Sequence, residues 1–144
     1  MAGKTYFGSS VRAGSYPSEY TDVGYAVLTQ QATIQAGGGA TDDANLVLPA
    51  NSEVLDILFD TTVAHTAATF TVAAGITAGG TEYASATDVK AAGRVRPTFT
   101  AAQLAAINNI STNTTVYFQS AAGTPTTTGT TVCKVLYRMR ADGE

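Results

Sequence analysis

The chain has 144 residues, of which 44% are hydrophobic and 13% are charged, and its formal net charge is −3. This length is typical of one domain that folds around a hydrophobic core without a metal or a disulfide. A disordered chain carries more charge, and a nucleic-acid binder is usually basic. One Cys and one His exclude a disulfide scaffold and a cysteine-rich zinc site within this chain, and argue against histidine-based metal sites.

The first ten residues hold one cation and no continuous apolar core, so we expect no secretory signal. The apolar stretches are also shorter than the ~18–20 residues that a membrane helix needs. We expect a soluble protein whose surface is largely uncharged and rich in Thr, Ala and Gly. Such a surface is suited to lying against another protein.

Residues 1–22 differ from the rest of the chain. They carry aromatic side chains among Gly, Ser and Pro, with no helical or strand period: Tyr6, Phe7, Tyr16 and Tyr20. An extended arm and a disordered tail are both open interpretations. The aromatic residues favour the arm, because solvated tails are usually poor in them.

From residue 23 onward, short strand patterns alternate with turns. Residues 24–29 and 32–35 predict one strand or two short ones, and residues 46–48 predict another that stops before a proline. The glycine-rich segment at residues 37–43 is typical of a flexible turn. It lacks the lysine and the spacing of a phosphate-binding loop.

The next strand, at residues 54–60, has the strongest alternation of the chain. The apolar face that we expect to point into the core carries Leu55, Ile57 and Phe59. Asp56 and Asp60 share the opposite face.

Residues 69–76 alternate in the same way, with an apolar face that carries Phe70, Val72, Ala74 and Ile76. Residues 83–89 give a weaker strand signal. Residues 93–97 show no regular pattern, so we expect an irregular segment there.

One short helix is expected after Thr100. The sequence from Thr100 to Gln103 matches a capping box, in which both side chains satisfy unpaired amides at the start of a helix. Leu104 and Ile107 then fall on one face, and the surrounding alanines favour helix. The pattern ends at Asn108.

Strands are expected at residues 115–119 and 130–140, with a hairpin-type loop at residues 121–129 between them. The last strand pairs an inward apolar face with a basic outward face, as in an antiparallel sheet that is covered on one side. The inward face carries Cys133, Val135, Tyr137 and Met139. The outward face carries Lys134, Arg138 and Arg140.

Short strands with frequent turns and one helix predict a mostly β fold. We expect an antiparallel β-sandwich or jelly roll with one short helix and an extended N-terminal arm. The predicted division is an arm at residues 1–22 and a β-sandwich domain at residues 23–144.

His65 and Cys133 are the residues on which nucleophilic chemistry would depend. His65 is expected in a solvent-exposed loop after the strongest strand, and no nucleophile motif surrounds any serine. Cys133 is expected to be a buried structural thiol, since free cysteine is usually buried. The acidic pairs at Asp42–Asp43 and Asp56/Asp60 do not match a calcium-loop pattern. We therefore expect no enzyme, no cofactor and no metal site.

Two basic groups stand out: Arg94 with Arg96, and Lys134 with Arg138 and Arg140. The negative net charge argues against a nucleic-acid surface. Two interpretations stay open. The groups form either a salt-dependent contact with an acidic protein surface or a simple solvated strand face.

Two stretches carry a resemblance to a known class of proteins. They read Leu-x-Leu-Pro-Ala-Asn-Ser-Glu-Val-Leu-Asp-Ile from residue 46 and Thr-Gly-Thr-Thr-Val-Cys-Lys-Val-Leu-Tyr-Arg from residue 128, with a Thr/Ala/Gly-rich alternating region between them. Together with the Gly/Ser arm, this arrangement resembles the small β-rich capsid decoration, or cement, proteins of tailed bacteriophages. The resemblance is one of pattern and covers roughly residues 25–140.

The resemblance implies a virion structural protein on the capsid exterior. Its partner would be the major capsid protein, and it would act as a homotrimer at threefold positions, without nucleic acid or membrane. The residues expected at the capsid interface are Tyr6, Phe7, Tyr16, Tyr20, Arg94, Arg96, Arg138 and Arg140. Alternatives are a head-fibre base or tail component, and a carbohydrate-binding β-sandwich, although the chain has no Trp to stack on a sugar ring.

Overall fold

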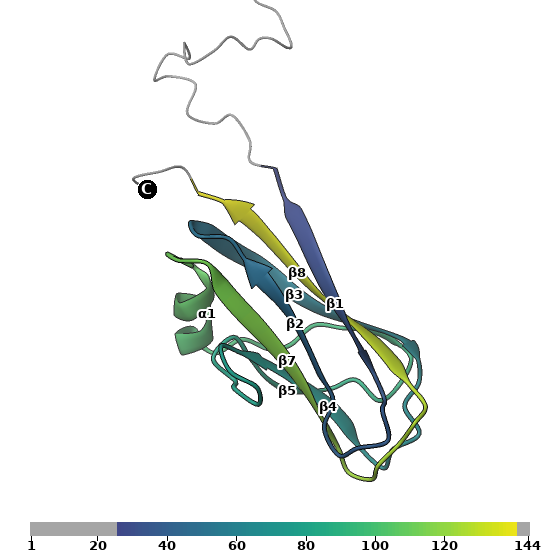
Figure 1. Ribbon diagram of the computed structural model, residues 1–144. Coiled ribbons are helices and arrows are strands. Elements are labelled where there is room, and N and C mark those ends of the chain that lie inside the picture. The colour runs from purple at the N-terminus through teal and green to yellow at the C-terminus, as the bar shows by residue number, and fades with distance from the viewer. Residues whose placement is uncertain (1–25, 141–144) are drawn as a thin grey trace, which may run out of the picture.

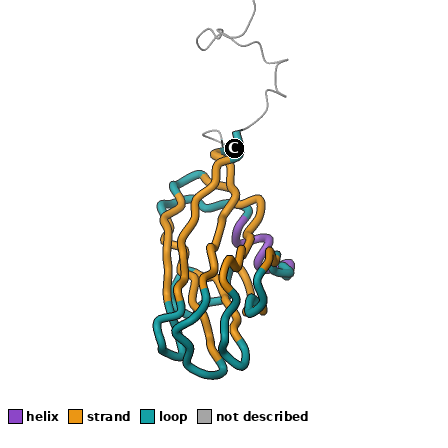
Figure 2. Tube along the Cα trace, turned by 90° about the vertical axis from the view of Figure 1, so that its right-hand side faces the viewer, coloured by secondary structure: helices purple, strands orange, loops and turns teal. Residues whose placement is uncertain are grey.

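The computed structural model describes residues 26–140, so the predicted arm at residues 1–22 and the start of the domain at residue 23 lie outside the described residues. Residues 26–140 form eight strands and one helix (Figures 1 and 2). The elements are β1 (Leu28–Gln35), β2 (Asp43–Leu48), β3 (Ser52–Val63), β4 (Phe70–Gly75), β5 (Ala84–Asp88), β6 (Gly93–Val95), α1 (Ala101–Ile107), β7 (Thr114–Ala122) and β8 (Thr130–Met139).

The strands of residues 26–140 make two antiparallel four-stranded sheets, in the orders β1-β8-β3-β6 and β2-β7-β4-β5. The first strand pairs with the eighth, the second with the seventh, the third with the sixth and the fourth with the fifth. This is the rolled-up hairpin of a jelly roll. Figure 2 shows the two layers packed face to face. The predicted fold class is confirmed.

The topology corrects the prediction for residues 121–129. Strands β7 and β8 belong to different sheets, so the segment between them crosses the sandwich instead of closing a hairpin. Turn-forming residues indicate that the chain reverses, but they do not determine which sheet the next strand joins.

The core lies between the two sheets. Phe59 of β3 and Phe118 of β7 meet edge to face across it, with ring centroids 6.3 Å apart. The inward face of β8 is as predicted for Cys133, Val135 and Tyr137, which are all buried. The prediction was wrong for Met139, which is exposed because it is the last residue of the strand.

A β-bulge in β3 overturns part of the strongest strand prediction. The pairing with β8 shifts between Val54 and Asp56, so that Leu55 is an extra residue in the ladder. One extra residue moves the alternation to the other face. Val54 is therefore buried before the bulge and Ile57 and Phe59 after it, whereas Leu55 is exposed.

Two further strand predictions were wrong. Strand β4 ends at Gly75, so Ile76 lies in the following turn, exposed, with its N–H donating to Glu82 Oε2 at 3.2 Å. The segment expected to be irregular contains β6, whose three residues pair with Phe59–Thr61 of β3. Segment β6 is a strand because β3 pairs with it, and three residues are too few to show an alternating pattern.

Helix α1 begins with the predicted capping box. Gln103 N–H donates to Thr100 Oγ1 at 3.2 Å, and Thr100 N–H donates to Gln103 Oε1 at 2.9 Å. The buried face is different from the prediction, because it carries Gln103 and Ile107, while Leu104 is 51% exposed. Gln103 Nε2 donates to Thr81 O and Ser85 Oγ, so a buried amide anchors the helix beside β5. Across residues 26–140, no helix is long and apolar enough to cross a membrane.

Candidate partner-binding surface

The described chain begins and ends at the same end of the sandwich (Figure 1). Leu28, the first residue of β1, is paired with Tyr137 near the end of β8. Residues 1–25 therefore join the domain at the end where Arg138 and Arg140 lie. The pairing of β1 with β8 is what places the first described residues beside these arginines.

Exposed apolar side chains gather at this end. Val27 is 56% exposed, Leu28 and Leu55 are each 40% exposed, and Met139 is 39% exposed. Strand pairing places them at one end of the sheet, since Leu28 is opposite Tyr137 and the bulged Leu55 lies beside the same part of β8. We call these four residues, with Arg138 and Arg140, the terminal surface.

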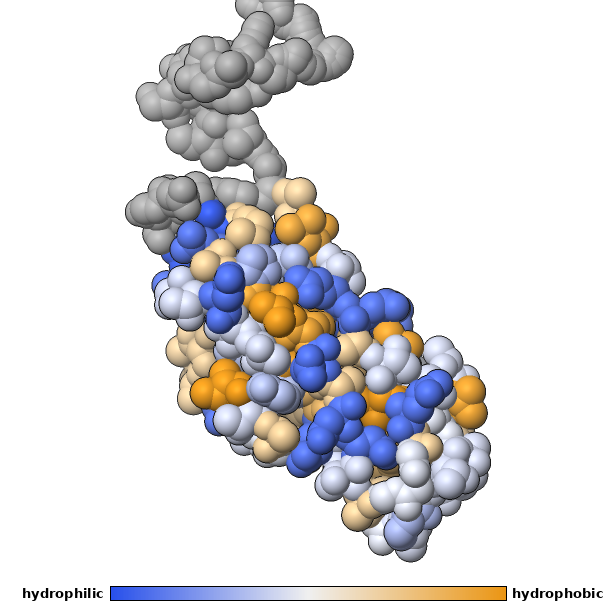
Figure 3. Space-filling model, viewed as in Figure 1, coloured by the Kyte–Doolittle hydropathy of each residue, from blue (hydrophilic) through white to orange (hydrophobic). Residues whose placement is uncertain are grey.

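Figure 3 shows hydrophobic residues at this end of the molecule. Several exposed apolar side chains near charged ones at one end of a domain are typical of a protein-binding site. Sequence analysis missed Val27, Leu28 and Leu55 as surface residues. Only the bulge and the position of the strand end expose them.

Arg96 and Arg138 face carboxylates on β3. Arg96 Nε lies 2.7 Å from Asp56 Oδ1, and Arg138 Nη2 lies 2.8 Å from Glu53 Oε2. The backbone N–H of Arg140 donates to Asn51 O at 2.7 Å. The outer face of this sheet is therefore a set of opposite charges in register, and not a basic patch.

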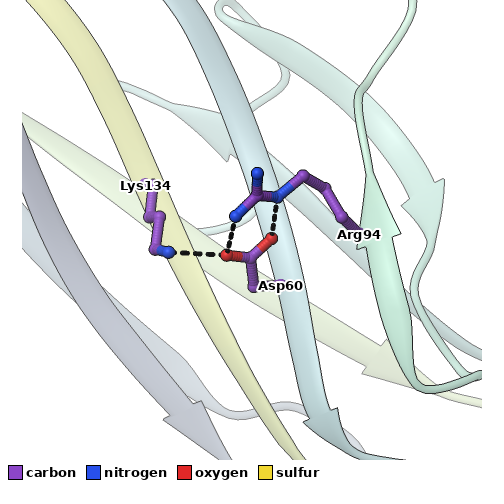
Figure 4. A network of polar contacts seen from close by, with 3 residues as sticks. All are labelled: Asp60, Arg94 and Lys134. Atoms are coloured by element: carbon purple, nitrogen blue, oxygen red, sulfur yellow. Dashed lines mark hydrogen bonds and ion pairs between the residues drawn. The ribbon is translucent and has the colours of Figure 1, made fainter.

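Asp60 has two cationic partners (Figure 4). Arg94 Nε and Nη2 bind its two oxygens at 2.5 and 2.8 Å, and Lys134 Nζ lies 2.6 Å from Oδ2. The hydrogen bonds from Arg94 and then Lys134 hold the pKa of Asp60 well below its usual value. Three strands, β3, β6 and β8, are tied together at this point.

The Asp60→Asn variant is expected to be less stable than the wild type at pH 7 by about 1 kcal/mol, because partly exposed ion pairs contribute 0–1 kcal/mol each. A lowered carboxyl pKa stabilises the fold above its unfolded value of about 3.8 and loses that contribution as the pH falls below it. Urea unfolding should therefore show the difference at pH 7 and a smaller one at pH 2.5. Asp56→Asn, which removes the carboxylate partner of Arg96, is the matched control. An equal difference in stability between the wild type and Asp60→Asn at both pH values would contradict the ionic explanation.

The arginines thus lie in two places. Arg138 and Arg140 belong to the terminal surface. Arg94 contacts β3 at Asp60. Asp60 is eight residues after Ser52, where β3 begins at the terminal surface, so it lies about 26 Å away at roughly 3.3 Å per residue. The structure brings the first two together and places Arg94 in β6, against Asp60, and Arg96 just after β6, against Asp56.

His65 lies in the loop after β3, as predicted, but the expectation of solvent exposure was wrong. Its side chain is 3% exposed and stacks on Phe70, with ring centroids 3.5 Å apart and an angle of 8° between the planes. Gly129 also lies against the imidazole, so closely that a Cβ at this position would overlap His65 Nδ1. Nothing near His65 in the sequence indicates these distant neighbours.

A chain of buried hydrogen bonds determines the tautomer of His65. Thr61 Oγ1 donates to Val89 O at 2.9 Å, and a hydroxyl has one proton, so Thr131 must donate to Thr61 across their 2.9 Å contact. Thr131 Oγ1 therefore accepts from His65 Nε2–H at 2.8 Å. Nδ1 is left unprotonated and has no hydrogen-bond partner among the described residues.

These buried groups are structural. Thr131 is fully buried beside His65, so no substrate reaches the hydroxyl–imidazole pair. Burial also raises the pKa of Cys133 to about 12, which keeps this thiol protonated. Within residues 26–140, no three His, Cys, Asp or Glu side chains are grouped as metal ligands.

Comparison with known proteins gives one informative likeness. No protein-family model matches the chain, and neither does any curated protein sequence. Among solved structures, a chain of the capsid of Ralstonia phage GP4 matches with a TM-score of 0.59 and 20% sequence identity. The match covers 92% of this chain and 94% of that chain. At this level of identity, the likeness shows that the two chains share a fold.

Proposed function

We propose that this chain is a structural protein of a bacteriophage virion, which binds the outer surface of the capsid and stabilises it as a decoration or cement protein. The observation that carries the proposal is the shared fold with a chain of a phage capsid over nearly the whole length of both chains. The jelly roll with an exposed apolar end supports it further. The role needs no chemical step, so the protein is proposed not to be an enzyme.

The terminal surface is the proposed contact with the major capsid protein. Val27, Leu28 and Met139 offer apolar area there, and Arg138 and Arg140 add charge. The segment that carries Tyr6, Phe7, Tyr16 and Tyr20 enters the domain at the same end. Aromatic and arginine side chains are the residues that most often dominate binding energy at protein interfaces.

Arg94 and Arg96 are proposed to contact a second capsid subunit. Their side chains are 61% and 60% exposed, although each is paired with a carboxylate. A homotrimer at threefold positions would place three such sides around one axis. A ligand that binds only the assembled lattice stabilises it by mass action, and several linked contacts increase the effect.

Deletion of residues 1–20 is expected to weaken binding to expanded capsids by at least about tenfold. It removes four aromatic residues, and the loss of even two such anchors at an interface is worth about 1.4 kcal/mol or more. The measurement is co-sedimentation of purified protein with capsids that lack it. A variant with alanine at Tyr6, Phe7, Tyr16 and Tyr20 is the length-matched control and should show the same loss. Circular dichroism and thermal melting should show the β-domain still folded.

Unchanged capsid binding by both variants would contradict the role of the arm. If the full-length chain does not bind capsids at all, the proposed function is wrong. Electron microscopy of labelled virions distinguishes the decoration role from the other virion roles, because a head-fibre base would label isolated points and a tail component would label the tail.

A further inference from the structure

Strand β1 has an open edge. It is the outermost strand of its sheet and pairs only with β8 among residues 26–140. Ala36 N–H donates to Gly129 O next to this ladder, which sets the phase of the antiparallel hydrogen bonds. Alternation then directs the N–H and C=O groups of four residues away from β8: Thr29, Gln31, Thr33 and Gln35.

The other sheet edges among residues 26–140 have features that discourage pairing. Strand β6 has three residues, of which Arg94 is charged. Strand β5 has a register shift against β4 and a helix amide bound at Ser85. Strand β2 begins with Asp43 and stops before Pro49.

Strand β1 has none of these features. Its eight residues, Leu-Thr-Gln-Gln-Ala-Thr-Ile-Gln, include no charge and no proline, and its register with β8 is unbroken. The residues whose backbone faces the open edge are all exposed. A long regular edge without charge is a template for another strand.

We propose that this edge pairs antiparallel with β1 of a second copy of the chain across a twofold axis. In the register that we assign, Gln31 lies opposite Thr33 of the second copy and Thr29 lies opposite Gln35 of the second copy. All four outward-facing residues of each copy are then paired, with about eight hydrogen bonds, since each such pair exchanges two. A shift by two residues leaves an end residue unpaired, and a shift by one turns the wrong backbone groups toward the partner.

A second copy is the favoured occupant because the strand is complementary to itself. The opposed side chains on the outer face are Gln against Thr at every position, so no like charges meet. Pairing would join two sheets into one, in the order β6-β3-β8-β1-β1-β8-β3-β6. This inference goes beyond the proposed function, and its test in solution does not require a capsid. On a capsid, such a twofold contact would link neighbouring trimers.

The test is a charge pair placed across the axis. In Q31K/T33K, each new lysine lies opposite a lysine of the second copy, whereas in Q31E/T33K each glutamate lies opposite a lysine. The full-length wild type and both variants are compared by sedimentation equilibrium over a hundredfold range of concentration. We expect an even number of copies for the wild type, half that mass for Q31K/T33K, and the wild-type mass for Q31E/T33K.

Circular dichroism of both variants provides the folding control, and the two variants differ at one position only. A monomeric wild type, or a mass that stays the same in Q31K/T33K, would overturn the proposal. Equal loss of mass in both variants would also overturn the assigned register. If Q31K/T33K keeps its mass but no longer binds capsids, the edge receives a strand of the capsid protein, and the assignment to a second copy is wrong.

Discussion

The Gly129→Ala substitution is expected to lower the free energy of unfolding by about 3–5 kcal/mol, because it combines backbone strain with the displacement of a buried ring. Gly129 has a φ of +134°, which L-residues rarely adopt. A Cβ at this position would also overlap His65 Nδ1 far inside van der Waals contact. The imidazole would have to move away from Phe70 and Thr131, losing the stacked contact and the 2.8 Å hydrogen bond.

Gly93→Ala separates the two causes. Gly93 has nearly the same φ, +138°, but a Cβ there meets nothing within 4 Å. Only backbone strain remains, so we expect a loss of about 1–2 kcal/mol. The entropy that an alanine removes from the unfolded chain is the same for both variants and cancels in the comparison.

Urea unfolding at pH 7.5 measures both variants, and thermal melting provides a second reading. The difference between them should be at least about 1 kcal/mol, or roughly 4 °C at about 4 °C per kcal/mol. Equal destabilisation by the two substitutions would show that the fit of His65 against Gly129 contributes nothing.

The second large effect is a loss of stability between pH 7 and pH 5, caused by His65. Desolvation lowers the pKa of His65 below its usual value of 6.5, and Asp42 offsets this only in part. The unfolded chain therefore binds a proton that the folded chain excludes. Stability is complete above pH 6.5 and falls below it with a slope of up to about 1.4 kcal/mol per pH unit, until the folded protein also takes up the proton.

The surroundings of the ring also predict that protonation of His65 destabilises the folded protein. A proton on the neutral ring would add to Nδ1, which faces Gly129 and has no hydrogen-bond partner among residues 26–140. The resulting cation would be buried with no hydrogen-bond acceptor at Nδ1, which disfavours protonation of the folded protein. Asp60 affects a separate range, since its lowered pKa makes stability fall only below about pH 4.

His65→Gln is the matched variant for this effect. Its amide N–H can still donate to Thr131, but the side chain does not titrate between pH 5 and 8. Urea midpoints at half-unit steps from pH 8 to pH 5 should slope downward for the wild type and stay flat for the variant. His65 is the only histidine of the chain, so a slope that persists in the variant would exclude an imidazole as its source.

The strand and helix predictions succeeded where the signal comes from adjacent residues. Alternation in β8 placed Cys133, Val135 and Tyr137 in the core, and the Thr100–Gln103 capping box occurs with both hydrogen bonds. Both signals depend on side chains within four positions of one another. They require no knowledge of the partner strand.

Predictions failed where a distant strand determines the outcome. The bulge at Leu55 reflects how β3 matches β8, some 80 residues away, and β6 exists because β3 offers it a partner. Leu104 was expected to share a face with Ile107, but Gln103 shares the buried face instead, because its amide binds Thr81 O, and Leu104 is exposed. None of these contacts has a local pattern.

The candidate site was predictable in its residue types and not in its location. Arg138 and Arg140 could be named from the sequence, whereas their position beside Val27, Leu28 and Met139 follows from the pairing of the first strand with the last. The carboxylate partners of Arg94 and Arg96 likewise depend on β6 lying against β3. The aromatic residues at positions 6, 7, 16 and 20 lie outside the described residues, and their role stays a prediction.

The sequence by itself determined the low charge, the Thr-rich strand faces, the buried thiol and the mostly β fold, because composition and alternation act through neighbouring residues. Only the tertiary structure decided which strands meet, and with them the opposed charges on β3, the buried His65 and the open edge of β1. The reason is that a strand forms its backbone hydrogen bonds with neighbouring strands on either side. The residues of one segment do not indicate which distant strands these neighbours will be.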